Sequence, residues 1–113
     1  MAVLSTQSAV LTGTTLTYAS CAGGGDKFRA GEHTMLAVTN ASGGAILVTV
    51  NDPNSDSPTS AAGFNPDVVV SVGAGTTKIF GPFPASRFRN SNDGMVDVTY
   101  NAVVGLSIAV VSV

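Results

Sequence analysis

Apolar and β-branched residues occur in short runs along this chain, and each run is closed by glycine, proline, asparagine or aspartate. Such runs are typical of short β-strands. We find no stretch with the i, i+3, i+4, i+7 apolar spacing of an amphipathic helix. The pattern predicts strands near residues 9–18, 34–40, 45–51, 67–72, 76–81, 95–101 and 104–112, with a further short extended piece near 2–5 or 85–89.

Two turns in this pattern predict hairpins. The turn 41–44 reads Ala-Ser-Gly-Gly after Asn40, and asparagine and glycine tolerate the positive φ that tight turns require. We expect the strand 34–40 to return across it as the strand 45–51. The glycine-rich turn 73–75 predicts a second hairpin between the strands on either side of it.

The remaining segments complete the expected architecture. The run 106–113 is apolar almost throughout, which predicts either a central strand buried on both faces or an edge strand covered by another subunit. The polar, proline-containing segment 51–66 predicts a long surface loop that touches a neighbour, and residues 1–8 predict an extended arm. We expect the whole chain, 1–113, to form a single all-β domain, an antiparallel β-sandwich or jelly-roll-like barrel of about seven to eight short strands.

Charged residues are scarce in this chain. They make up 11% of its 113 residues, whereas hydrophobic residues make up 44%. An average soluble protein has about 25% charged residues, so this chain either hides part of its surface against a partner or is a soluble domain coated with small polar residues. The net charge is −2 with only five cations. This composition predicts no nucleic-acid partner.

The sequence also bears on the compartment of the protein. Cys21 is the only cysteine, so an internal disulfide cannot form, and this fits a reducing cytoplasm. The N-terminal residues show neither the basic region nor the apolar core of a signal peptide. No apolar run approaches the roughly 20 residues that span a bilayer. We therefore expect synthesis in the cytoplasm and no membrane association.

No residue pattern predicts catalysis or a cofactor. His33 is the only histidine, and no Gly-x-Ser-x-Gly motif is present, so we expect His33 to be an exposed or hydrogen-bonded structural residue. Cys21 has no local base, which favours a small packing residue over a nucleophile. The glycine triplet 23–25 lacks the Gly-Lys-Ser/Thr of a phosphate-binding loop. We expect a non-enzymatic protein.

One segment has the spacing of a calcium loop in part. Oxygen donors alternate from Asp52 to Asp56, but Ser57 and Gly63 stand where an EF-hand needs a glycine and a glutamate. The sequence therefore predicts no EF-hand and favours a solvated turn. A looser calcium site that joins Asp52, Asp56 and Asp67 remains an open alternative.

Aromatic and arginine residues gather after the second predicted turn. Phe80, Phe83 and Phe88 lie within nine positions around a Gly-Pro-Phe-Pro break that cannot run through the middle of a sheet. Phenylalanines are large core residues, but aromatics and arginine are also what interface centres favour, and both uses remain open. We predict that Phe83, Arg87, Phe88 and Arg89 form a contact patch.

Several segments between residues 20 and 113 carry a further signal when they are taken together. They are Gly25-Asp26-Lys27-Phe28 before the strand 34–40, the turn 40–44 into Val48-Thr49-Val50, the run 67–77, Gly81-Pro82-Phe83 with Arg87-Phe88, and Asp93-Gly94 into the strand 95–100. In these features the chain resembles small all-β virion proteins of tailed bacteriophages, in particular the capsid decoration, or cement, proteins.

The resemblance implies a structural protein on the exterior of an icosahedral capsid. It implies binding to the phage major capsid protein and self-association as a homotrimer, with no nucleic acid and no membrane. A protein that binds only the assembled lattice stabilises it by mass action. Two alternatives remain: a tail or head–tail joining component, or a β-sandwich module that binds carbohydrate or a cell surface, for which Tyr18 and Tyr100 are the stacking candidates.

Overall fold

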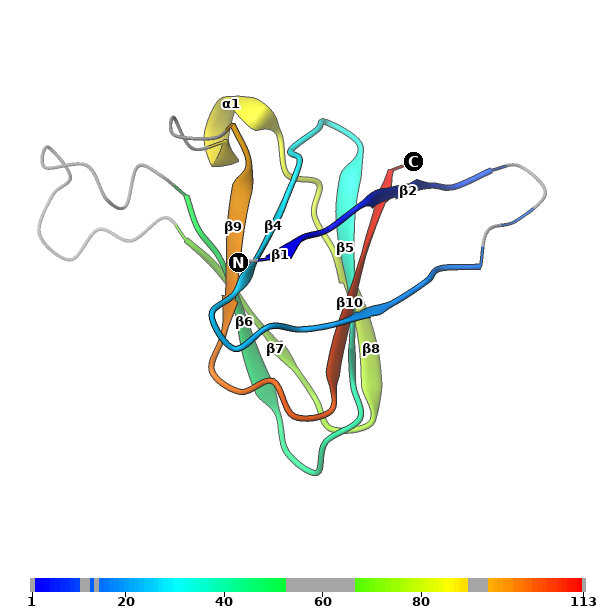
Figure 1. Cartoon of the computed structure of the whole chain (residues 1–113), viewed down its shortest axis with the longest axis vertical. Helices are drawn as coiled ribbons and strands as arrows, with labels where there is room; N and C mark the ends of the chain where they lie inside the picture. Colours follow the sequence, from blue (N-terminus) through cyan, green and yellow to red (C-terminus); the bar gives the residue numbers. More distant parts are fainter. Residues whose placement is uncertain (1, 11–12, 14, 53–66, 90–93, 113) are drawn as a thin grey trace, which may run out of the picture.

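Two five-stranded β-sheets packed face to face form the body of the protein (Figure 1). The computed structural model describes residues 2–10, 13, 15–52, 67–89 and 94–112. Sheet A has the order β1 (Ala2–Val3), β4 (Asp26–Phe28), β9 (Val96–Tyr100), β6 (Ile46–Val50) and β7 (Val68–Val72). Sheet B has the order β2 (Thr6–Ser8), β10 (Leu106–Ser112), β5 (Thr34–Asn40) and β8 (Thr76–Phe80), and β3 (Ala19–Ser20) also pairs with β10.

The prediction of an all-β sandwich is confirmed. The strand predicted at 34–40 has those bounds in the structure, and the five strands predicted after it are found within two residues at each end. The short extended piece expected near 2–5 is β1. Two pairings are parallel, β1 with β4 and β2 with β10, so the sheets are not wholly antiparallel as predicted.

The two predicted hairpins are wrong. β5 pairs with β8 and β10 but not with β6, and β7 pairs with β6 but not with β8. The turns after β5 and β7 instead carry the chain from one sheet to the other. The segment β5–β6 therefore runs antiparallel to the segment β7–β8 as one long two-stranded ribbon. The ribbon bends once, so that the β5–β8 pair lies in sheet B and the β6–β7 pair lies in sheet A. Turn-forming residues specify a change of direction, but they do not specify which strand the next one will pair with.

The same crossing recurs along the chain. β1 and β2, β3 and β4, and β9 and β10 are each split between sheet A and sheet B in the same way. Each sheet therefore receives one strand from each of these pairs, whereas β2 and β3 share sheet B and β6 and β7 share sheet A. The inward-facing side chains of both sheets then meet in a single core, whose largest fully buried members are Phe28, Phe83, Leu36, Ile108, Val38 and Val48.

β10 resolves the alternatives left open for the C-terminal run. It lies inside sheet B, with β5 along one edge and β2 and β3 along the other. Leu106 and Ile108 to Val111 are all buried. The run is therefore a central strand buried on both faces, as near-continuous apolar sequence indicates.

One predicted strand is wrong. The described residues of 9–18 belong to no ladder and are exposed, apart from half-buried Leu16, because β-propensity forms a strand only where a sheet edge is within reach. Residues 85–89, the other place considered for the short extended piece, hold the helical turn α1 (Ala85–Phe88), which follows Pro84. A proline pre-sets the φ of a helix start. Among the described residues no helix is long and apolar enough to cross a membrane.

Candidate interaction surfaces

Four phenylalanine rings meet at the end of the sandwich that α1 covers. The ring of Phe83 makes edge-to-face contacts with Phe28 at 5.5 Å, Phe80 at 6.0 Å and Phe88 at 5.2 Å between centroids. Phe28, Phe83 and Phe88 are all buried. Rings in this arrangement stabilise one another beyond the apolar area that they bury. The cluster joins β4, β8 and α1 into one packed end.

The predicted contact patch is therefore wrong for its two aromatic members. Phe83 is 2% exposed and Phe88 is 3% exposed, so both rings are core residues. Of the predicted patch, Arg87 and Arg89 lie at the surface. The spacing of phenylalanines could not distinguish these uses, because the same residue type fills cores and interface centres.

Gly81 explains how Phe83 enters the core so soon after an edge strand. Gly81 has a φ of 133°, a conformation that side-chain-bearing residues rarely adopt. A Cβ there would lie 3.1 Å from the Cα of Met35 and 3.2 Å from the Phe83 ring. Glycine thus permits the close approach that turns the chain inward. A hollow of about 530 Å³ remains beside this break, with Phe83 and Phe88 in its floor and Arg87 among its lining residues.

An ion pair joins α1 to Asp52, which follows β6. The Arg87 Nε donates to Asp52 Oδ2 at 2.8 Å, and its guanidinium lies 4.7 Å from the centroid of the Phe88 ring. Asp52 is buried, and its backbone N–H donates to Asp67 Oδ1 at 2.7 Å. Burial of the Asp52 carboxylate is thus compensated by a cation.

This ion pair bears on the open calcium alternative. One oxygen of Asp52 accepts a bond from Arg87, and one oxygen of Asp67 accepts a bond from the Asp52 N–H. Both carboxylates would have to share these oxygens with a bound calcium ion. Asp56 and the rest of 53–66 lie outside the described residues. Within the described part of the chain, no group of three or more His, Cys, Asp or Glu side chains could hold a metal ion.

A buried polar network lies where sheet A meets the turn after β3. The Tyr100 hydroxyl donates to Asp26 Oδ2 at 2.6 Å, and the Ala22 N–H donates to the same oxygen at 3.2 Å. Burial, reinforced by the bond to Asp26, raises the pKa of Tyr100. Desolvation also raises the pKa of Cys21 to about 11, so its thiol stays protonated near neutral pH. This matches the expected packing role of Cys21.

The raised pKa values predict a loss of stability at alkaline pH. In the unfolded chain the pKa of Cys21 is near 9.0 and that of Tyr100 near 10.0, whereas in the folded protein the pKa of Cys21 is raised to about 11 and that of Tyr100 is also raised. The unfolded state therefore binds fewer protons above pH 9, and stability falls as pH rises, by up to about 1.4 kcal/mol per pH unit for each group. Urea unfolding at pH 8, 9, 10 and 11 measures this slope.

The variant Cys21→Ala is the control for this pH dependence. It removes one of the two titrating groups, so its stability should fall less steeply than that of the wild-type protein between pH 9 and 11. Equal slopes for the two proteins would contradict the assignment to Cys21.

The N-terminal segment, defined here as residues 2–8, closes one side of the sandwich. β1 pairs with β4 at the edge of sheet A, and β2 pairs with β10 in sheet B. The Leu4 N–H donates to the Lys27 carbonyl at 2.7 Å, and Leu4 packs against the core between the two sheets. Figure 1 shows this segment in dark blue, crossing from one sheet to the other.

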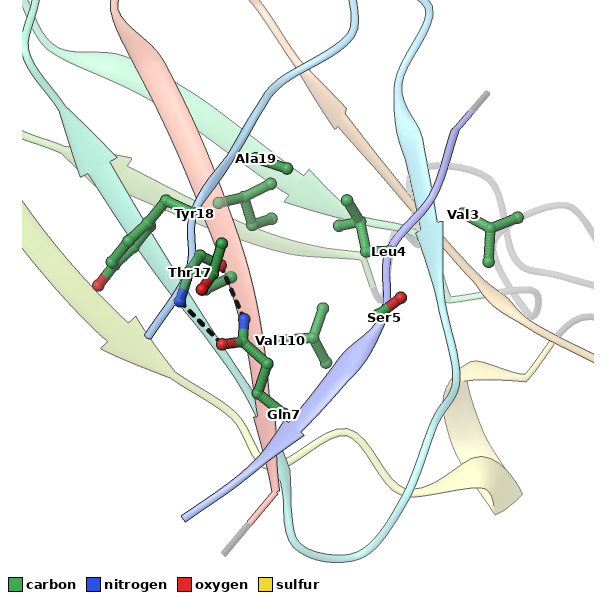
Figure 2. Close-up of a pocket in the computed structure, with 10 residues that line it drawn as sticks. Val3, Leu4, Ser5, Gln7, Thr17, Tyr18, Ala19 and Val110 are labelled. Carbon is green, nitrogen blue, oxygen red and sulfur yellow. Dashed lines mark hydrogen bonds between the residues drawn. The ribbon is translucent and has the colours of Figure 1, made fainter. Parts of the chain in front are cut away.

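Beyond β2 the chain leaves the body of the protein. We call residues 9–18 the arm; in Figure 1 its described residues run out past β10 and return to β3. Val10 and Tyr18 are exposed on it. Gln7 ties the base of the arm together, because its side-chain amide donates to the Thr17 carbonyl at 2.7 Å and accepts from the Thr17 N–H at 2.8 Å (Figure 2). The Gln7 side-chain amide thus makes the two bonds with Thr17 that a backbone residue would make in a β-ladder.

A pocket of about 370 Å³ separates the N-terminal segment from the base of the arm (Figure 2). Leu4, Ser5 and Gln7 line it on one side and Thr17 to Ala19 on the other, over Ile108 to Val110 of β10. β2 and β3 pair with different parts of the same edge of β10, and the pocket lies where they diverge. The N-terminal segment is therefore packed incompletely on this side.

The opposite side of the sandwich carries the outer strands β7 and β8. The N–H and carbonyl of Leu47 both bond to Asn101 in the turn after β9, so they point away from β7. Ser71 lies opposite Leu47 on β7, and its own carbonyl therefore points away from β6, toward the outside of the sheet. Lys78 of β8 donates to this carbonyl at 2.9 Å. A lysine at such an edge disfavours pairing with another chain. The side chains of Val69 and Ile79 nevertheless remain exposed beside it.

β1 agrees with the short extended piece predicted near 2–5, whereas β2 lies in the part of residues 1–8 that was expected only as an extended arm. A strand of two or three residues has too few positions to show alternation. His33 is exposed in the turn before β5, as expected for a structural residue.

No protein-family model, no curated protein and no solved structure matches this chain.

Proposed function

We propose that this protein is a non-enzymatic structural component of a phage virion, which binds the exterior of the capsid lattice and stabilises it. Its partners in this proposal are the major capsid protein and further copies of itself. Each copy that binds the assembled lattice, but not the free subunits, adds its binding free energy to the assembled state.

The observation that carries the proposal is the arm and its attachment. The arm has no charged residue, its described residues Val10 and Tyr18 are exposed, and its base is held by Gln7 and Thr17. Low charge suits a surface that becomes covered, since charged residues are depleted at interface centres. A tail or head–tail joining role uses the same features, and only the identity of the lattice distinguishes it.

A carbohydrate-binding role rests on a narrower observation. Tyr18 lines the pocket beside the arm together with polar Gln7 and Thr17, whereas Tyr100 is engaged by Asp26. One partly exposed tyrosine offers a single stacking platform. Glycan-array binding that is lost in Tyr18→Ala would favour this role over capsid binding.

The test of the proposal is co-sedimentation with capsids. The probe is capsids assembled from the major capsid protein encoded near this gene, mixed with purified protein at micromolar concentration. We expect saturable pelleting of the protein with capsids and a higher melting temperature of the decorated shells. Pelleting with purified tails, but not with capsids, would assign the joining role instead. No pelleting with either would contradict a virion role.

A further inference from the structure

We propose that residues 2–8 are exchanged between copies of this chain, so that the N-terminal segment of one molecule completes the sandwich of another. The acceptor is the surface that this segment occupies in its own chain: the edge of β4 that pairs with β1, the C-terminal half of β10 and the core residues against which Leu4 packs. This inference concerns the self-association within the proposed function, and it rests on contacts that the single chain already makes.

The donated segment fits the acceptor surface because the same segment already occupies that surface in its own chain. In the exchanged state each contact is replaced by the same contact from another copy: the β1–β4 and β2–β10 ladders, the Leu4 N–H to Lys27 carbonyl bond and the Gln7–Thr17 pair. Exchange of an identical element therefore introduces no new interface chemistry. The segment carries no charged side chain that must be desolvated on the way.

The attachment of the segment is weak enough to release it. Its ladders join two residues to β4 and three to β10. The pocket of about 370 Å³ leaves one side of it without packing. The described residues of the arm are exposed, apart from half-buried Leu16, and its described bonds to the body are from Ala9 to Ser112 and from Thr17 to Gln7, so release of the segment costs few core contacts there.

Mass action decides which state prevails. A segment tethered by a short flexible linker meets its own groove at an effective concentration of about a millimolar. Copies held side by side on a repeating surface, or concentrated in solution, reach comparable values. Exchange should therefore be rare in dilute solution and rise with protein concentration.

A disulfide between register partners can report the exchange. Ser8 of β2 and Ser112 of β10 are direct partners at the surface, so Ser8→Cys with Ser112→Cys, in a Cys21→Ala background, brings two thiols together. The purified protein is unfolded, refolded at concentrations from about 10 µM to 1 mM, oxidised, and run on a non-reducing gel. A segment in its own chain gives a cross-linked monomer, and an exchanged segment gives covalent dimers or larger species.

We expect the ratio of covalent oligomer to cross-linked monomer to rise about in proportion to protein concentration. The matched control pairs Ser8→Cys with Ile79→Cys, an exposed position on β8 that is not a partner of β2, and it should give far less oligomer. Cross-linked monomer alone at every concentration, or equal oligomer in the control, would overturn the proposal.

A second pair guards against a folding defect in the first. Val3 and Lys27 are register partners of β1 and β4, and neither is a core residue, so Val3→Cys with Lys27→Cys should report the same ratio. Disagreement between the two pairs would also contradict exchange of the whole segment. Both assays use the purified chain alone, so a negative result leaves capsid binding to be decided by co-sedimentation.

Discussion

Replacement of Asn40 by aspartate is expected to destabilise the protein by about 3–5 kcal/mol, because it places an uncompensated charge in the core. Asn40 is fully buried at the bend between β5 and β6. Its Nδ2 donates to the carbonyls of Gly44 at 2.8 Å and Val72 at 2.9 Å, while its Oδ1 accepts from the Ser42 N–H and hydroxyl. In Asn40→Asp an oxygen takes the place of Nδ2 and faces the two carbonyls.

Urea unfolding at pH 7 measures this effect as a lower midpoint, with Asn101→Asp as the matched control. Asn101 is exposed, and its Oδ1 accepts from the Leu47 N–H, so an aspartate retains that bond and should change stability by less than about 0.5 kcal/mol. The deficit of Asn40→Asp should shrink at acidic pH, where the carboxyl is neutral and can donate once. Similar midpoints for the two variants would show that Asn40 does not hold the bend.

Phe83→Ala is expected to cost about 3–5 kcal/mol, since it opens a cavity at the centre of the aromatic cluster. Phe83 is the ring that Phe28, Phe80 and Phe88 all contact. Its loss removes three edge-to-face contacts together with the apolar area that they enclose. Thermal and urea unfolding measure the loss, and Phe83→Leu, which retains part of the volume, should lose less.

The control for this prediction is Ile79→Ala on the adjacent strand. Ile79 is 57% exposed, so its truncation should change stability by less than about 1 kcal/mol. If Phe83→Ala were as mild as Ile79→Ala, the ring would lie at the surface. The contact patch predicted from the sequence would then be reinstated.

The strands could be predicted from the sequence much better than their pairing. The run Val68–Val72 and the alternation in Val96–Tyr100 are local patterns, and local patterns suffice to define a strand. Pairing depends on which backbone edges meet in space. The bends at 41–45 and 73–75 contain the residues of hairpin turns, yet they cross between sheets because Asn40 bonds the end of β7 across the bend. That contact is invisible in a turn motif.

The candidate surfaces were predictable only in part. The sequence identified 80–89 as unusual, and the proline break does end β8, but burial of Phe83 follows from the conformation of Gly81 and not from residue type. The sequence pattern predicted an extended piece near 2–5 but not β2 or the pairing of either strand, because β1 and β2 are too short to form ladders without β4 and β10. The importance of the N-terminal segment becomes apparent only from the pocket and ladders around it.

The most direct test of a capsid-binding role is the stoichiometry of the protein on purified capsids, measured by quantitative gel analysis after pelleting. We expect a saturating, fixed number of copies per major capsid protein, and we expect that Val10→Ser with Tyr18→Ser, at exposed positions, lowers this number while the sandwich still unfolds cooperatively. Absence of saturable binding by the intact, folded protein would contradict this role.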